Sequence, residues 1–459
     1  MNALQTHDAL ARKVEQSTGE NAYLCYQCQR CSAGCPMAEH FDLLPSEVLR
    51  AIQEGDTSVA RSRTVWLCAS CQTCVTRCPQ GIDLPTILDR FRQETLDRPS
   101  VPEVARFYKA FMRQVKTLGR VYELGLIGEL NLREMQPLRD LPMGLRMIRK
   151  GKIRLLPEVA RPSRRPPWVG TAPNRVAYYP GCSLHATGRA YDRSFRAAAQ
   201  HLGVELVEPP GWTCCGTTPA HGTDAFLAAA LPLRNLALIE RMGVERVVAP
   251  CAACYGRFKA ALAEYRDDGA LAVRVDDWMR YEYRDTVNVE SALDLLERRV
   301  AGDGFEPRRP LAGLKVACYY GCLLTRPARI TGAPDPENPR SMERIVRALG
   351  AQPVEWSRKT DCCGGSLSVP QVERAKELTA KVLQDAKARG ADLVAVACPL
   401  CQVNLDERQP EMASDLGFTI PVVYVTQLLA LAAGLPLAAA ALELSAVDPK
   451  PVLARAGHA

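Results

Sequence analysis

Cysteines carry most of the chemistry that this sequence can do. Two runs, CYQCQRCSAGCP (25–36) and CASCQTCVTRCP (68–79), share the spacing C-x2-C-x2-C-x3-C-P. This spacing is typical of sites for cubane [4Fe–4S] clusters, where three cysteines of one run and the last cysteine of the other bind the same cluster. Structural zinc is the alternative, although zinc motifs rarely use three evenly spaced cysteines with a fourth before proline. We predict one cluster on Cys25, Cys28, Cys31 and Cys78 and a second on Cys68, Cys71, Cys74 and Cys35.

Two further cysteine sets each contain an adjacent pair followed by glycine. They are Cys182, Cys214, Cys215, Cys251 and Cys254, and then Cys322, Cys362, Cys363, Cys398 and Cys401. Adjacent cysteines do not easily bond to each other, because their side chains diverge. The N-terminus shows no signal peptide, so we expect a reducing cytoplasm, where clustered cysteines bind metal or do redox work.

The two glycine-containing sets belong to an internal repeat. RVAYYPGC matches KVACYYGC, VELVEPPGWTCCG matches QPVEWSRKTDCCGG, and RVVAPCAAC matches LVAVACPLC. Alternating strand and helix signals in each copy indicate α/β units with mostly parallel strands, whose sites form beyond the carboxyl ends of the strands. We therefore expect Cys182, Cys251, Cys322 and Cys398 at strand ends, converging on one edge of each repeat.

The predicted fold class is a multidomain α+β protein. Residues 1–100 form an α-helical ferredoxin module, with helices starting near Pro45 and Pro85, and residues 101–173 form a helical region and a basic, Pro-rich linker. The helical signals there are VARFYKAFMRQV and GLRMIRKG. The two repeated α/β domains cover residues 174–301 and 314–445, and residues 446–459 are expected to be a frayed tail.

Charge and hydropathy exclude several classes of function. The net charge is +7, and much of the excess lies in 146–168, either a solvated linker or a docking surface for an acidic partner or an anionic substrate. No nucleic-acid motif is present, and no GxGxxG fingerprint predicts NAD or FAD on this chain. The most apolar stretch, 425–444, is interrupted by Gly434 and Pro436, so we expect core and surface helix rather than a membrane span.

The cysteine pattern resembles that of the heterodisulfide reductase family. The two CCG repeats resemble its catalytic B subunit, and the N-terminal part, including WLCASCQTC, resembles its C subunit, so the chain to about residue 440 looks like a C–B fusion similar to the D subunit. The resemblance implies a noncubane [4Fe–4S] cluster on each five-cysteine set, with adjacent thiols such as Cys214 and Cys215 on neighbouring irons. A single occupied CCG site is the alternative.

The resemblance implies an electron-transfer chain that ends in disulfide reduction. Electrons would pass from the two cubane clusters to the two noncubane clusters, where a small disulfide bound between the CCG domains is cleaved, or formed in reverse, at Cys214, Cys215, Cys362 and Cys363. Because the chain is basic, we expect this disulfide to be anionic. The expected partner is an A-like flavoprotein or a membrane cytochrome subunit, with cytoplasmic or peripheral membrane location and an oligomer of heteromers as an open possibility. The alternative is an electron-relay subunit of a flavin dehydrogenase of the glycolate or glycerol-3-phosphate type, which passes electrons to quinone.

Three residues remain outside these sets. Cys318 is expected to be a buried structural thiol. His185 and His221 lie near the first CCG site, as hydrogen-bonded residues or as proton donors to a leaving thiolate. The resemblance leads us to expect a histidine near the second CCG strand end, but Tyr319, Tyr320 and Leu323 stand there.

Overall fold

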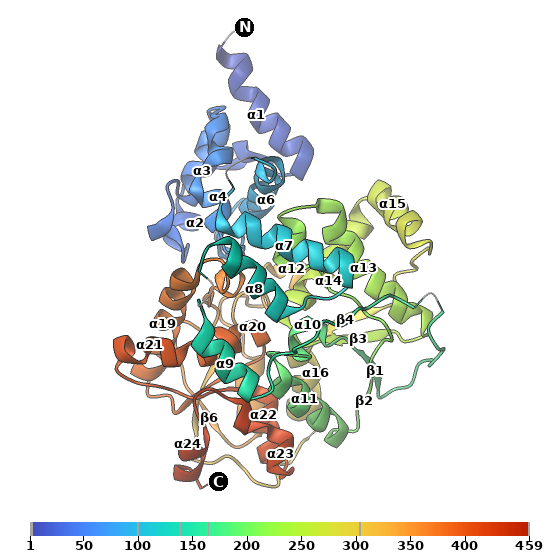
Figure 1. Cartoon of the computed structure of the whole chain (residues 1–459), viewed down its shortest axis with the longest axis vertical. Coiled ribbons are helices and arrows are strands. Elements are labelled where there is room, and N and C mark those ends of the chain that lie inside the picture. Colours follow the sequence, from blue (N-terminus) through green and yellow to red (C-terminus); the bar gives the residue numbers. More distant parts are fainter. Residues whose placement is uncertain (1–2, 99–100, 137–138, 164, 303, 458–459) are drawn as a thin grey trace.

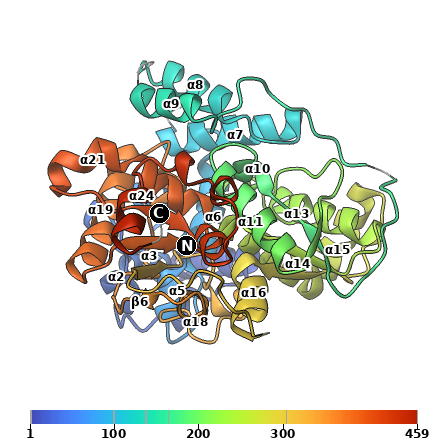
Figure 2. The same ribbon diagram turned by 90° about the horizontal axis from the view of Figure 1, so that it is seen from below.

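A helical N-terminal module lies at one end of the molecule, and two α/β domains lie side by side beneath it (Figure 1). The computed structural model describes residues 3–98, 101–136, 139–163, 165–302 and 304–457. Viewed from below, helices α7 (Glu103–Leu118), α8 (Glu123–Arg133) and α9 (Leu141–Arg149) run along one side of the molecule (Figure 2). The predicted class, a helical module followed by two repeated α/β domains, is confirmed.

The N-terminal module consists of short helices around the two cysteine runs. Its α-helices are α1 Ala3–Thr18, α2 Arg30–Ala33, α3 Pro45–Gln53, α4 Arg63–Leu67, α5 Thr73–Arg77 and α6 Leu84–Thr95. Helix α3 starts at Pro45 as predicted and buries Val48 and Ile52, because residues four apart share one face of a helix. The Asp83 carboxylate caps α6 by accepting from the Thr86 N–H at 3.1 Å.

Each α/β domain contains one four-stranded, fully parallel sheet. The first sheet has the order β2-β1-β3-β4, with β1 Arg175–Tyr178, β2 Glu205–Val207, β3 Arg246–Ala249 and β4 Asn288–Ser291. The second repeats it as β6-β5-β7-β8, with β5 Lys315–Tyr319, β6 Gln352–Pro353, β7 Leu393–Val396 and β8 Val422–Tyr424. The central strands read as short apolar runs because helices cover both faces of a parallel sheet.

Helices follow the strands in the same order in both domains. The first domain has α10 Gly181–Leu184, α11 Arg189–His201, α12 Thr217–His221, α13 Ala225–Arg241, α14 Ala252–Asp267, α15 Gly269–Met279 and α16 Ala292–Leu296. The second has α17 Ala328–Thr331, α18 Ser341–Ala348, α19 Val372–Ala388, α20 Pro399–Gln402, α21 Gln409–Leu416, α22 Val425–Ala432, α23 Leu437–Ala440 and α24 Lys450–Arg455. Helix α22 is buried throughout, so the prediction of core helix for 425–444 is confirmed there.

The two α/β domains pack through helices α11 and α22. Tyr191 and Tyr424 stack with ring centroids 4.3 Å apart, and the hydroxyls of Ser194 and Thr426 lie 2.6 Å apart. The aromatic stack and the hydroxyl pair fix the two sheets relative to each other, so that the cysteines at their strand ends can share one space.

Three helices connect the N-terminal module to the α/β domains: α7 Glu103–Leu118, α8 Glu123–Arg133 and α9 Leu141–Arg149. The sequence signals cover α7 and α9 only, whereas α8 has a weak apolar face consisting mainly of Leu126 and Leu130. The apolar residues of α7 and α8 join one hydrophobic cluster with the N-terminal module and with Cys214 and Cys362.

Two irregular segments differ in part from expectation. The basic stretch after α9 is anchored at its start, because the Lys152 ammonium is fully buried and pairs with the Glu407 carboxylate of the second α/β domain, whereas Leu155, Leu156 and Val159 beyond it are exposed, as expected for a solvated linker. The expected frayed tail contains α24, which buries Val452 and Leu453 against the core of the second domain; residues 458 and 459 lie outside the described residues. The ion pair of Lys152 and the burial of Val452 and Leu453 order these residues, although the local composition favours irregular chain.

Candidate functional site

The cysteines of the N-terminal module gather around two separate small cavities. Cys25, Cys28, Cys31 and Cys78 line one cavity of about 20 Å³, which Cys74 also reaches. Cys35, Cys68, Cys71 and Cys74 line a second cavity of about 20 Å³. This grouping matches the crossed sets predicted from the spacing, while ligation itself stays a prediction. We call these the outer and the inner cysteine cavity, since Cys28 of the first is exposed and Cys71 of the second is buried.

All ten cysteines of the two CCG repeats line one cavity of about 240 Å³, which we call the sulfur cavity. These cysteines are Cys182, Cys214, Cys215, Cys251, Cys254, Cys322, Cys362, Cys363, Cys398 and Cys401. Cys182 follows β1 and Cys251 caps α14 after β3, and Cys322 and Cys398 occupy the corresponding places after β5 and β7. The expected position at strand ends is confirmed, and the two edges face each other across this one cavity.

Thiol contacts link the domains across the sulfur cavity. Within each repeat, Cys215 Sγ lies 3.3 Å from Cys254 Sγ, and Cys363 Sγ lies 3.6 Å from Cys401 Sγ. Between the repeats, Cys251 and Cys398 lie close enough for each to shift the pKa of the other. Cys71 of the inner cavity and Cys362 affect each other in the same way. Sulfur atoms therefore line a continuous path from the inner cavity into both CCG repeats.

The thiols in contact share protons. The hydrogen bond from Cys362 lowers the pKa of Cys71 to about 6, and the same contact raises the pKa of Cys362 well above its usual value. At the other contact, the hydrogen bond from Cys251 lowers the pKa of Cys398. Opposite shifts in the two partners mean that one sulfur of each contact loses its proton more readily than the other. Thiolates are the form that binds metal.

Backbone N–H groups support the sulfur atoms. Gly216 N donates to Cys214 Sγ at 3.4 Å, and Gly364 N donates to Cys362 Sγ at 3.3 Å. Both glycines have a positive φ, 84° and 77°, which turns the chain directly after each cysteine pair in a conformation that side chains disfavour. The third residue of each Cys-Cys-Gly motif is thus explained by backbone geometry beside the sulfurs.

A tyrosine hydroxyl binds the backbone immediately before each cysteine pair. The Tyr179 hydroxyl donates to the Thr213 carbonyl at 2.7 Å, immediately before Cys214. In the second repeat the Tyr319 hydroxyl donates to the Asp361 carbonyl at 2.6 Å, immediately before Cys362. Tyr319, at the position where a histidine was expected, therefore holds the loop that carries Cys362 and Cys363.

The rest of the sulfur cavity is lined mainly by apolar side chains from α7, α8 and α9 and the segment that follows. They include Phe107, Phe111, Leu126, Met143, Met147 and Ile153. Its charged lining residues are Glu123, Asp140 and Arg408, and the last two pair with each other at 2.9 Å. The basic residues Lys150 and Arg154 line a different cavity of about 430 Å³, beside Arg189 and Arg193. The expected preference for an anionic substrate has no support in the charges of the sulfur cavity.

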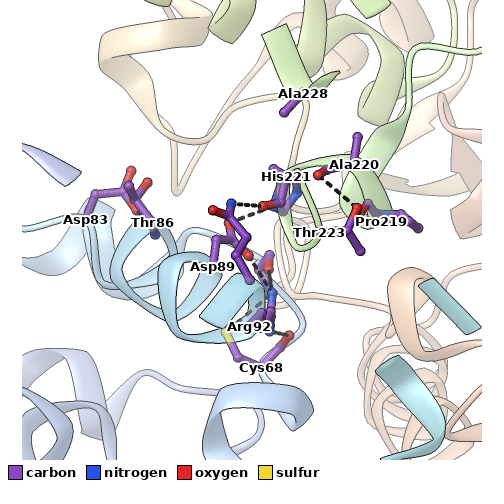
Figure 3. Close-up of polar contacts among 12 residues, drawn as sticks. Cys68, Asp83, Thr86, Asp89, Arg92, Pro219, Ala220, His221, Thr223 and Ala228 are labelled. Carbon is purple, nitrogen blue, oxygen red and sulfur yellow. Dashed lines mark hydrogen bonds and ion pairs between the residues drawn. The ribbon is translucent and has the colours of Figure 1, made fainter. Parts of the chain in front are cut away.

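His221 lies at the boundary between the N-terminal module and the first CCG domain, and it does not line the sulfur cavity. Its Nδ1 lies 2.6 Å from the Asp89 carboxylate, and Asp89 also accepts from the buried Arg92 guanidinium at 2.8 Å (Figure 3). Burial alone would raise the pKa of Asp89, but His221 and Arg92 together hold it below its usual value. Arg92 donates in turn to the Cys68 carbonyl at 2.6 Å. His221 therefore stabilises the loop of the inner cavity.

The remaining two residues are placed as follows. His185 pairs with Glu208 at 3.2 Å and lies near Arg154, outside the sulfur cavity. Cys318 is fully buried in β5, so its prediction as a buried thiol is confirmed. Neither expected histidine thus reaches the space in which a thiolate would leave. The spacing of the cysteines gave no signal for Glu123, which lines that space from α8.

The donor sets fit iron–sulfur clusters. The residues that line the two small cavities include the cysteines but no histidine or carboxylate, and each CCG repeat presents five thiols with N–H donors beside them. Within the part of the chain that the structure describes, no group of three or more histidine, cysteine or carboxylate side chains is arranged to hold a single metal ion. In the same part, no helix has the length and apolarity that crossing a membrane requires.

Family models match both halves of this arrangement. The cysteine-rich CCG domain matches residues 176–259 and again 316–406, and the 4Fe-4S dicluster domain matches residues 21–82. The dicluster match indicates two [4Fe–4S] sites in the N-terminal module. The paired CCG matches coincide with the two sheets.

Several characterised proteins are similar to more than half of the chain. The 8-methylmenaquinol:fumarate reductase membrane anchor subunit of Wolinella succinogenes is 33% identical over 59% of this chain and 96% of its own length. The B subunit of the ferredoxin/F420H2-dependent CoB-CoM heterodisulfide reductase of Methanosarcina acetivorans is 29% identical over 57% of this chain and 89% of its own length. The D subunit of the dihydromethanophenazine:CoB–CoM heterodisulfide reductase of Methanosarcina barkeri is 24% identical over 52% of this chain and 56% of its own length.

A solved structure shares the fold over nearly the whole chain. The crystal structure of a hypothetical protein from Helicobacter pylori has a TM-score of 0.62 at 9% identity, and the match covers 95% of this chain and 75% of that one. At that identity the likeness concerns the fold alone.

Proposed function

We propose that this chain reduces a disulfide in the sulfur cavity with electrons received through the N-terminal module. The chain belongs to the heterodisulfide reductase family, in the group similar to its B and D subunits. It has the two CCG domains and the N-terminal 4Fe-4S dicluster domain of that group. The observation that carries this proposal is the continuous line of thiols from the inner cavity, through Cys71 and Cys362, to the ten cysteines of the sulfur cavity. When bound, iron–sulfur clusters at these sites supply one-electron transfer.

Electrons enter at the outer cavity in this proposal. Cys28 is exposed there, and the neighbouring Tyr23, Leu24 and Tyr26 are 50%, 49% and 60% exposed. Exposed aromatic and apolar groups beside a redox site favour docking of a donor protein. We propose that this donor is a flavoprotein or a membrane cytochrome subunit. The relatives that share the CCG pair are themselves named as subunits of larger reductases.

The chain contributes position and exclusion of water at the reacting end. The facing strand ends hold Cys215 and Cys254 of one repeat opposite Cys363 and Cys401 of the other. The apolar side chains of α7, α8 and α9 exclude water and leave space for apolar groups of a substrate. We therefore propose an apolar disulfide as substrate in place of the anionic one first expected.

A second candidate function is reduction or oxidation of a quinone at the same place. The apolar lining of the cavity favours a quinone ring as much as an apolar disulfide, and the Wolinella relative is named as a methylmenaquinol:fumarate reductase subunit. This activity would make the chain an electron relay between a redox partner and quinone.

Anaerobic turnover with a one-electron donor distinguishes the two candidates. Holoprotein with reduced methyl viologen is supplied with dibutyl disulfide, with its anionic counterpart 3,3′-dithiodipropionate, and with 2,3-dimethyl-1,4-naphthoquinone. We expect thiol release, faster from dibutyl disulfide than from dithiodipropionate. Naphthoquinone reduction without thiol release from either disulfide contradicts the first proposal and supports the second.

A further inference from the structure

We propose that Glu123 exchanges the proton that disulfide cleavage in the sulfur cavity requires; this inference rests on the proposed function. Glu123 is the first residue of α8 and lines the sulfur cavity together with Cys182. Thr187 donates to its Oε1 at 3.2 Å, whereas Oε2 is buried and has no hydrogen-bond partner among the described residues. A buried carboxyl oxygen without a partner is costly and is retained where it has work to do.

The other ionisable groups on the cavity wall are already engaged. Among the described non-cysteine residues that line it, Asp140 pairs with Arg408 at 2.9 Å, and the Tyr179 hydroxyl donates to the Thr213 carbonyl. The Tyr320 hydroxyl donates to Glu343, which lies away from the sulfurs. His185 and His221 do not line the sulfur cavity. Glu123 therefore brings to this cavity a carboxyl group whose Oε2 has no hydrogen-bond partner among the described residues.

The surroundings place the titration of Glu123 near neutrality. Burial raises the pKa of Glu123 to about 7, against the hydrogen bond from Thr187 and the weaker attraction of Lys152 and Arg154. Both cations have other partners, because Lys152 pairs with Glu407 and Arg154 with Glu158. Charged and titratable groups surround Glu123 from the segments before and after α8, from α10 and from the second domain. They are Arg120, Tyr122, Asp140, Lys152, Arg154, Glu158, Cys182, His185 and Arg408. A carboxyl that titrates near pH 7 can both give and regain a proton there.

A second, smaller cavity connects Glu123 to the surface. Val121, Glu123 and Cys182 line both the sulfur cavity and a neighbouring cavity of about 20 Å³. The neighbouring cavity is also lined by Arg154, Glu158 and His185, and its rim includes Leu156, which is 79% exposed. A space of about 10–15 Å³ holds one water, so a single water can link Glu123 to the polar groups at the rim. Glu123 thus has access to protons from one side and to the thiols from the other.

The reaction balances with Glu123 in this role. Cleavage of R–S–S–R′ breaks one S–S bond and takes up two electrons and two protons to give RSH and R′SH. The electrons come one at a time from the external donor through the N-terminal module. The Oε2–H of Glu123 gives one proton to a leaving thiolate sulfur, and the carboxylate regains it through the smaller cavity, which allows Glu123 to serve both thiols in turn.

The test compares Glu123→Gln with Glu129→Gln in the holoprotein. Glu129 lies on the same helix but pairs with Arg113 and Arg133 outside the cavity. Because burial also raises the pKa of Asp406 to about 7, two protonated carboxyl bands should disappear near pH 7 in infrared difference spectra of the parent and of Glu129→Gln between about pH 5 and pH 9. In Glu123→Gln one of these bands should be missing, and the band of Asp406 should remain. Iron content should be equal in all three proteins.

Turnover of dibutyl disulfide with reduced methyl viologen supplies the second readout. Because the protonated carboxyl is the donor, the parent rate should fall as pH rises through about 7. Glu123→Gln should be about 100-fold slower below that pH and lack this limb, and Glu123→Asp should recover part of the rate.

Each outcome leads to a definite conclusion. An unchanged rate and pH profile in Glu123→Gln, or no carboxyl band that this variant removes, overturns the role of Glu123. A parent protein that releases no thiol overturns the disulfide function instead. In that case the infrared titration still decides the protonation of Glu123, and the pH profile of naphthoquinone reduction, which also takes up two protons, decides its role.

Discussion

Replacing Arg92 with methionine tests how the N-terminal module holds the inner cavity against the first CCG domain. Arg92 is fully buried, and its guanidinium donates to the carbonyls of Val65 and Cys68 at 2.6 Å. It also donates to the Ser70 hydroxyl at 3.0 Å and to the Asp89 carboxylate at 2.8 Å (Figure 3). Methionine fills similar space but satisfies none of these acceptors.

The expected cost follows from the groups left unpaired. Breaking a buried ion pair costs about 3–5 kcal/mol, and each buried acceptor without a donor costs about 1–3 kcal/mol. His221 still pairs with Asp89 in the variant, so the lower end applies. We expect a loss of about 3 kcal/mol in the local stability of the Cys68 loop, which corresponds to roughly 100-fold faster amide exchange.

Anaerobic hydrogen exchange with mass spectrometry measures this loss peptide by peptide. The peptides of interest cover residues 64–77 of the module and 217–224 of the first CCG domain. Arg90→Met is the matched control, because Arg90 lies on the same helix and makes a partly exposed pair with Glu94 at 3.1 Å. Such a pair contributes at most about 1 kcal/mol. Equal exchange in Arg92→Met and Arg90→Met would refute the reasoning.

Three further results are expected. Cys78→Ser should remove the spectroscopic signal of the cluster at the outer cavity and Cys35→Ser that of the inner one, because the fourth thiol comes from the other run; the reverse assignment contradicts the crossed sets. Anaerobically purified protein should contain about sixteen irons and little zinc by elemental analysis, and a value near eight would leave the CCG repeats without clusters. Lys152→Met should destabilise the protein by about 3–5 kcal/mol in denaturant unfolding by leaving Glu407 unpaired, whereas Lys13→Met, at the surface pair with Glu94, should have little effect.

The sequence predicts the cysteine grouping well, because cysteine spacing and strand ends are local properties. The spacing C-x2-C-x2-C determines which thiols share a loop, and the position of Cys251 two residues after the run RVVA places it at a strand end. The regular alternation of strand and helix makes the parallel sheets predictable. These features depend on a few neighbouring residues and on rules that hold in every parallel sheet.

The contacts through which the two repeats meet could not be predicted in this way. The contact of Cys251 with Cys398 depends on the packing of Tyr191 against Tyr424, which no local spacing encodes. The burial of Lys152 against Glu407 likewise joins residues far apart in the chain. Composition suggested a solvated basic linker there, and the tertiary pairing overrode it.

Glu123 escaped prediction for a related reason. Its helix has a weak apolar pattern, and a single glutamate near a helix start usually acts only on the helix dipole. Its chemical setting comes from Thr187, the thiols and the two cavities, which are brought together only by the fold. His185 and His221 were candidates in the sequence because they lie close to the first CCG motif in the chain. In the fold, neither side chain lines the sulfur cavity.

A single-turnover experiment tests most directly the claim that electrons from the N-terminal module reach a disulfide at the CCG cysteines. The protein is reduced anaerobically, freed of donor and mixed with dibutyl disulfide, while reoxidation of the N-terminal clusters and thiol release are followed together. The variant Cys362→Ser/Cys363→Ser is compared with Cys318→Ala, which alters a buried thiol of the same domain outside the sulfur cavity. We predict that Cys318→Ala reoxidises and releases two thiols per two electrons, whereas the double variant is reduced normally but neither reoxidises nor releases thiol. Reoxidation with thiol release in the double variant would contradict the account.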